Sequence, residues 1–236
     1  MTTGDLAHHR TDYAVVEQEP PELLARNLRT GSHLWSSATV FFFVGFLFAF
    51  FYLRTLNSAG LWKPKGVPVP WGYGTAVFAI LLLSVVLGRL ALAERRAAGR
   101  TRPLDQARLR AWRSRGLVAL LLALAALVLQ CVEFATLGFG PSSGTYASVF
   151  VGWSGLMAVF VLGGIYWLET ILATSFRYRK TVRLAPGEAA GDSYRSRQDI
   201  ADPLALVLPG LEAFSFFWLM LGIIEVVTYI LLFGVQ

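Results

Sequence analysis

Three glutamates lie within long apolar stretches of this 236-residue sequence, and they are its best candidates for chemistry: Glu133, Glu212 and Glu225. Gln130 precedes Glu133 by three residues, so the two side chains share one face of any helix that contains them. An ionisable group inside an apolar segment is costly in lipid, and Glu133 must therefore face protein or water. Such groups can form hydrogen bonds, bind protons or contact a lipid headgroup.

Two interpretations of Glu133 stay open from the residues alone. Its carboxyl can join helices, with Gln130 or a hydroxyl group of a neighbouring helix as its partner, or it can move protons or bind a lipid headgroup. Glu225 lies deeper in its segment and has Thr228 three residues later, whereas Glu212 is expected near the inner face. We therefore take Gln130, Glu133 and Glu225 as candidate buried polar residues with a proton-related or lipid-related role.

The residue types argue against a redox centre or a metal site in this chain. All of its histidines precede the first apolar segment: His8, His9 and His33. Haem in a membrane bundle needs axial ligands inside the spans, and Met157 and Met220 each stand alone there. Copper and zinc sites need several His and Cys ligands, but Cys131 is the single cysteine. We expect no catalytic residue, no metal and no cofactor in this chain.

The composition predicts an all-α, polytopic membrane protein. Hydrophobic residues make up 55% of the chain and charged residues only 15%, whereas a soluble domain carries about 25% charged residues. The polar residues cluster between five apolar runs, each long enough to cross a hydrocarbon core of about 30 Å. We expect transmembrane helices at about residues 34–54, 74–93, 116–137, 146–172 and 206–233.

The chain divides into a tail and a membrane domain in this interpretation. Residues 1–30 are polar and are expected to form a cytoplasmic tail with a short surface helix near residues 21–28, either solvated or docked on a partner. Residues 31–236 form the five-helix domain. Between its third and fourth helices, Gly, Pro and Ser residues at 138–144 break any helix and reverse the chain. Glycines in the fourth helix should admit close neighbours: Gly152, Gly155, Gly163 and Gly164.

The basic residues predict the orientation. Three segments on one side of the membrane hold seventeen of them: Arg10, Arg26, Arg29, Arg95, Arg96, Arg100, Arg102, Arg108, Arg110, Arg113, Arg115, Arg177, Arg179, Lys180, Arg183, Arg195 and Arg197. The other side has three, Arg54, Lys63 and Lys65. Basic residues mark the cytoplasmic face, so the amino terminus is expected inside and the carboxyl terminus outside. The net charge of +6 therefore indicates loops beside an anionic membrane surface, and we expect no nucleic-acid partner.

Several short fragments of the sequence follow one another in an order that indicates a relationship to a known family. They are an aromatic helix from Ser37 to Phe-Tyr-Leu-Arg at 51–54, a Pro-containing loop at 62–70, Leu-Leu-Leu-Ser at 81–84, Gln130, Glu133 with Phe134, Tyr-Ala-Ser-Val-Phe at 146–150, a Gly-containing core at 155–164, and Phe217, Trp218 and Tyr229. In this order they resemble subunit III of the haem-copper oxidases, the cytochrome c oxidase subunit 3 family. The likeness covers about residues 32–234, in a five-helix form without the family's first two helices.

The sequence also departs from the family's pattern. Met157 and Phe160 stand where the family has two histidines in this helix, and Ala38 stands where it has a buried acid. The family's Trp-His-Phe-x-Asp becomes Trp-Leu-Met-Leu-Gly at residues 218–222. Apolar groups of similar bulk preserve a fold in such changes, but functions that need those polar groups are put in doubt. Glu133 is the family acid that carries over.

The resemblance implies an auxiliary subunit without redox centres in a respiratory terminal oxidase of the cell inner (plasma) membrane. Such a subunit packs beside the large haem-bearing catalytic subunit, binds lipids, and supports assembly, proton uptake and durability of the catalytic site. Haem and copper are then expected in partner subunits. An accessory protein of nitric-oxide reductase and a small membrane transporter are the alternatives, and an integral membrane enzyme would need a catalytic cluster that is not evident here.

Overall fold

The structure is a computed structural model that describes residues 21–56, 62–63, 68–98, 106–183 and 207–235. Residues 1–20 of the tail expected at residues 1–30 lie outside this range, as do some of the basic residues used to predict orientation: Arg10, Lys65, Arg100, Arg102, Arg195 and Arg197. The long helices are α1 (Pro21–Leu56), α2 (Trp71–Ala98), α3 (Gln106–Thr136), α4 (Thr145–Arg183) and α6 (Val207–Tyr229). Each contains a segment long and apolar enough to cross a membrane, so the prediction of five such helices is confirmed.

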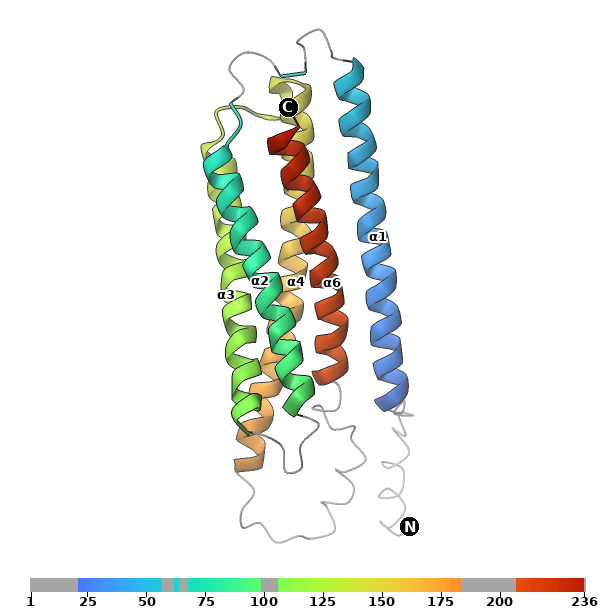
Figure 1. The fold of residues 1–236 in the computed structure, drawn as a ribbon, viewed down its shortest axis with the longest axis vertical. Coiled ribbons are helices and arrows are strands. Elements are labelled where there is room, and N and C mark those ends of the chain that lie inside the picture. The colour runs from blue at the N-terminus through green and yellow to red at the C-terminus, as the bar shows by residue number, and fades with distance from the viewer. Residues whose placement is uncertain (1–20, 57–61, 64–67, 99–105, 184–206, 236) are drawn as a thin grey trace, which may run out of the picture.

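The helices form an up-and-down bundle (Figure 1). α2, α3, α4 and α6 surround a common interior, and α1 packs beside them against α6 and α4. The start of α1, the end of α2, the start of α3, the end of α4 and the start of α6 lie at one end of the bundle (Figure 1). This arrangement gathers the described arginines that flank these helices at that end, which we call the basic end.

The first helix is longer than the sequence analysis expected. α1 begins at Pro21 and runs without interruption to Leu56, so the short surface helix expected near residues 21–28 is the first two turns of α1 and not a separate element. Proline is favoured at the first helical position because its missing N–H has no intrahelical partner there. Gly31 has open space around it, and a single glycine costs only about 1 kcal/mol in a helix interior.

Close helix contacts depend on particular glycines. A Cβ atom on Gly164 would lie 2.1 Å from the Trp218 ring, and one on Gly152 would lie 3.2 Å from Phe46. Gly155 and Gly163 have no such neighbour within 4 Å. Two of the four glycines expected to admit close neighbours therefore do so, because only these two face another helix.

Side-chain hydrogen bonds also join the helices across the interior. Ser84 of α2 donates to the carbonyl oxygen of Ala119 in α3 at 2.7 Å, and it accepts from Nε1 of Trp218 in α6 at 3.2 Å. All three positions are buried, Ala119 and Ser84 completely. These bonds satisfy polar groups that have no access to water, and they hold α2, α3 and α6 in one register.

The alternation of the helices allows a direct test of orientation. Ser114, near the basic end, and Ser143, in the 3₁₀ turn η1 (Pro141–Ser143) at the opposite end, are both exposed. In a Cys131→Ser background, we expect an impermeant thiol reagent to label Ser114→Cys only from the cytoplasmic side and Ser143→Cys only from outside, because basic residues are retained inside. The extent of labelling of each variant is compared between whole cells and inverted membrane vesicles. The reverse pattern would refute the predicted orientation.

Candidate functional site

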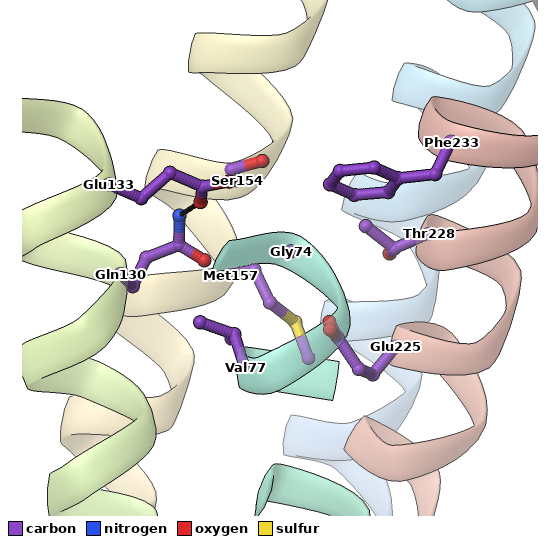
Figure 2. A pocket seen from close by; sticks show the side chains of 9 residues that line it. All are labelled: Gly74, Val77, Gln130, Glu133, Ser154, Met157, Glu225, Thr228 and Phe233. Carbon is purple, nitrogen blue, oxygen red and sulfur yellow. Dashed lines mark hydrogen bonds between the residues drawn. The ribbon is translucent and has the colours of Figure 1, made fainter. Parts of the chain in front are cut away.

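A small cavity lies inside the bundle, between α2, α3, α4 and α6 (Figure 2). It is lined by Gly74 and Val77 of α2, Gln130 and Glu133 of α3, Ser154 and Met157 of α4, Glu225 and Thr228 of α6, and Phe233 of the π-helical turn η3 (Ile230–Gly234) that continues α6. The space open to the centre of a water molecule is about 10 Å³, which is the size needed for about one water. The structure thus brings together Gln130, Glu133 and Glu225, the residues singled out from the sequence.

Glu133 is buried, with 1% of its surface exposed, three residues before the end of α3. The side-chain amide of Gln130 donates a hydrogen bond to Oε2 of Glu133, as their spacing of three residues allows. Oε1 of Glu133 has no hydrogen-bond partner in the described part of the chain. The partner is therefore Gln130, and no hydroxyl group of a neighbouring helix takes that role among the described residues.

The aromatic hydroxyl of Tyr146, in the helix that follows Glu133, does not bind Glu133. Tyr146, in the first turn of α4, donates its hydroxyl proton to the carbonyl oxygen of Leu232 at 2.9 Å. Leu232 belongs to η3, so this bond fixes the end of α6 against α4. This role of Tyr146 was not predicted from the sequence, because the π-helical turn that presents the carbonyl has no evident signal there.

Glu225 enters the cavity from the side opposite to Glu133 (Figure 2). It is buried, with 6% exposure, although Thr228 stands one turn later on the same helix. The Thr228 hydroxyl is already engaged, since it accepts from Nε1 of Trp153 at 2.8 Å and donates to the carbonyl oxygen of Ile224 at 2.8 Å. Thr228 therefore connects α6 to α4 and does not neutralise or bind Glu225.

The two positions where the family pattern has histidines lie in different surroundings. Met157 is buried and lines the cavity, and its side chain extends between α3 and Glu225 (Figure 2). Phe160 faces α1, where its ring lies 5.8 Å from that of Phe43 and 6.1 Å from that of Trp35. An unbranched thioether fills irregular space, so Met157 shapes the cavity, whereas Phe160 belongs to the contact between α1 and α4.

Glu212 is not part of this cavity. Its carboxylate pairs with Arg29 of α1 at 2.8 Å and with Arg96 of α2 at 3.0 Å, at the basic end. That Glu212 lies at the inner face stays a prediction, because it depends on the predicted orientation of the basic end. The ion pairs explain how an acid is tolerated in the first turns of α6. Both arginine side chains are about half exposed, and exposed pairs contribute only about 0–1 kcal/mol each.

A second carboxylate at the basic end has the same arrangement. Glu94 of α2 pairs with Arg115 at 2.6 Å and with Arg108 at 3.4 Å, both from α3. The sequence analysis assigned these arginines to the membrane surface without finding their acidic partner. Acids placed between two arginines join the ends of α1, α2, α3 and α6 while leaving this end of the bundle with an excess of positive charge.

The expectation that this chain binds no metal and no haem stays a prediction. Within the described ranges, no three His, Cys, Asp or Glu side chains are grouped so that they could hold a metal ion. The cavity offers two carboxyl groups, an amide, two hydroxyls and one thioether. This set can bind water and protons and form hydrogen bonds, and it contains no nucleophile paired with a base.

The chain is similar to cytochrome c oxidase subunit 3 of two rodents. The chain is 27% identical over 168 residues to cytochrome c oxidase subunit 3 of Mus musculus, and the match to the same subunit of Rattus norvegicus has the same identity and length. The aligned part is 67% of this chain and 59% of each relative, so this chain matches about three fifths of their length. No protein-family model matches. The similarity supports a distant relationship to cytochrome c oxidase subunit 3.

Proposed function

We propose that this chain is a non-catalytic auxiliary subunit, of the subunit III type, in a haem-copper terminal oxidase. The observation that carries the proposal is the 27% identity to cytochrome c oxidase subunit 3 over 168 residues. It is supported by five helices of membrane-spanning length and by the ordered fragments that resemble this family. In this role the chain resides in the cell inner membrane and contributes to oxygen reduction in aerobic electron transport without binding the haem or copper itself.

The arrangement of α1 suits assembly with other membrane helices. α1 contacts only one side of the bundle, and much of its remaining surface carries large apolar side chains that this chain leaves exposed: Leu34, Trp35, Phe41, Phe42, Val44, Phe48, Phe51 and Tyr52. In a bilayer, such a surface packs against lipid tails or partner helices by van der Waals contact. In the proposed complex, the large haem-bearing subunit and bound lipids cover these side chains.

The polar interior suits a supporting role in proton handling. Gln130, Glu133 and Glu225 are enclosed within the bundle, and intramembrane acids in such positions are typical of proton relays. At the opposite end, the excess of arginine attracts anionic lipid headgroups. We propose that these two regions support proton uptake and lipid binding by the complex, and that the buried helix contacts support its assembly and durability.

Purification of the chain from its native membrane tests this function. A tagged chain is expected to copurify with a large haem-bearing subunit that consumes oxygen, and the chain separated from that complex should show no haem absorption and no stoichiometric copper. Deletion of the chain should leave haem in the complex but lower its turnover or shorten its active life. Difference spectra, metal analysis and oxygen consumption measure these results.

Three outcomes would contradict the proposal. A haem carried by the isolated chain would refute the non-catalytic role. Copurification with a complex that reduces nitric oxide but not oxygen would favour the accessory protein of nitric-oxide reductase. A stable homo-oligomer that transports a solute in liposomes, with no oxidase partner in the membrane, would favour the transporter.

A further inference from the structure

We propose that the cavity between α2, α3, α4 and α6 is a proton-binding site in which Glu133 and Glu225 share one proton through enclosed water. The two acids come from helices far apart in the sequence, and their side chains enter one cavity from opposite sides (Figure 2). The inference concerns this chain alone and does not depend on the proposed function. It rests on an unpaired oxygen, on the charges around it and on the residues that line the cavity.

The unpaired oxygen is Oε1 of Glu133. It is fully enclosed, and nothing in the described part of the chain donates a hydrogen bond to it, while Oε2 accepts from Gln130. A buried polar atom without a partner is costly, and the cost is larger for a charged group. Either a water in the adjoining cavity or a proton on the carboxyl removes this cost.

The charges around the cavity favour the proton. Among its nine lining residues, Glu133 and Glu225 are the two ionisable groups, and none is Lys, Arg or His. α2 contributes Gly74 and Val77, and α4 contributes the neutral groups Ser154 and Met157. The Tyr146 hydroxyl, also on α4, donates to the carbonyl oxygen of Leu232 and to neither acid.

Two ionised carboxylates in one apolar cavity without a cation would repel each other and would both lose their hydration. One proton removes a charge and turns one acid into a donor toward the other. The bound species is therefore a proton held between two carboxyl groups, with no covalent change in either.

Enclosed water completes the connection between the acids. The cavity has room for about one water, and such a water needs two to four polar partners. Glu133, Glu225, Gln130 and Ser154 all line this space, and each has a polar side chain.

Phe233 forms part of the cavity wall. A Cβ atom on Gly74 would lie 2.0 Å from the Phe233 ring, so the ring rests directly on the backbone of α2 at the cavity wall (Figure 2). Phe233 belongs to η3, and π-helical turns within helices occur frequently at functional sites. The ring thereby limits exchange of the proton with the medium at the end of the bundle opposite to the basic end.

Infrared difference spectroscopy of the purified full-length chain in lipid nanodiscs tests the proposal. At neutral pH, we expect a protonated-carboxyl C=O band that shifts to lower wavenumber in D₂O and disappears only in alkaline buffer. Glu133→Gln and Glu225→Gln should each abolish or shift this band, because each removes one of the two acids that share the proton. Glu169→Gln, on the exposed surface of α4, is the matched control and should leave the band unchanged.

Each result decides the matter. Absence of the band in the wild-type chain at neutral pH would overturn the proposal, and this measurement stands even if a variant fails to fold. A band that survives unchanged in either cavity variant would show that the two acids do not share a proton. Loss of the band in Na⁺ or K⁺ buffer, but not in choline buffer, would assign the cavity to an alkali cation instead.

Discussion

Replacement of Gly164 by alanine is expected to destabilise the bundle strongly. The new Cβ would lie 2.1 Å from one ring carbon of Trp218 and 2.7 Å from another, distances at which one group must move. Trp218 cannot move easily, since it is 1% exposed, stacks on Phe214 and donates to Ser84. Overpacking of this kind costs about 1–3 kcal/mol and occasionally more, and here it also threatens the bond from Trp218 to Ser84.

The neighbouring glycine provides the control. Gly163→Ala adds the same methyl group to the same helix, but nothing lies within 4 Å of its Cβ position. Since alanine is favoured over glycine in a helix interior by about 1 kcal/mol, this variant should keep or raise the free energy of unfolding. Circular dichroism during titration with a denaturing detergent measures both. Equal stability of the two variants would show that α4 and α6 do not pack as closely as described.

The existence of the five helices followed from the sequence, because long apolar runs separated by polar residues have few alternatives in a bilayer. Their ends did not follow as well. The apolar pattern marks the part of each helix suited to lipid, whereas α1, α3 and α4 continue into polar sequence, to Pro21, Gln106 and Arg183 respectively. In α1 and α3, ion pairs at the basic end hold those turns, through Arg29 with Glu212 and through Arg108 and Arg115 with Glu94, and such pairs are not visible as hydropathy.

The candidate site was predicted only as separate residues. The spacing of Gln130 and Glu133 predicts a shared helix face, and the structure has a hydrogen bond there. That Glu225 meets them in one cavity depends on how α3 and α6 are rotated about their axes, which is set by contacts such as Ser84 with Ala119 of α3 and Gly164 with Trp218 of α6. The spacing of residues along one helix does not predict which residues of a distant helix will contact them.

The largest loss among single aromatic residues is expected for Trp153→Ala. Trp153 is 1% exposed on α4, its ring centroid lies 6.0 Å from those of Phe43 and Phe46 on α1, and its Nε1 donates to Thr228 on α6. It therefore joins three helices at one point. Truncation of a buried Trp costs about 3–5 kcal/mol, and the Thr228 hydroxyl beside the cavity would lose the hydrogen bond that it accepts from Trp153.

The loss should be concentrated at α1, because α1 packs against only one side of the bundle. Spin-label distances between α1 and α4 should broaden in Trp153→Ala, and the free energy of unfolding should fall. Trp153→Phe keeps a ring between Phe43 and Phe46 but removes the bond to Thr228, so it should cost only about 1 kcal/mol. Tyr166→Ala truncates an aromatic residue of the same helix that is 68% exposed, and it should change neither measurement. Trp153→Ala could instead give the same spin-label distances and the same free energy of unfolding as Tyr166→Ala. In that case other contacts would hold α1 to the bundle, and the proposed role of Trp153 in joining the helices would be wrong.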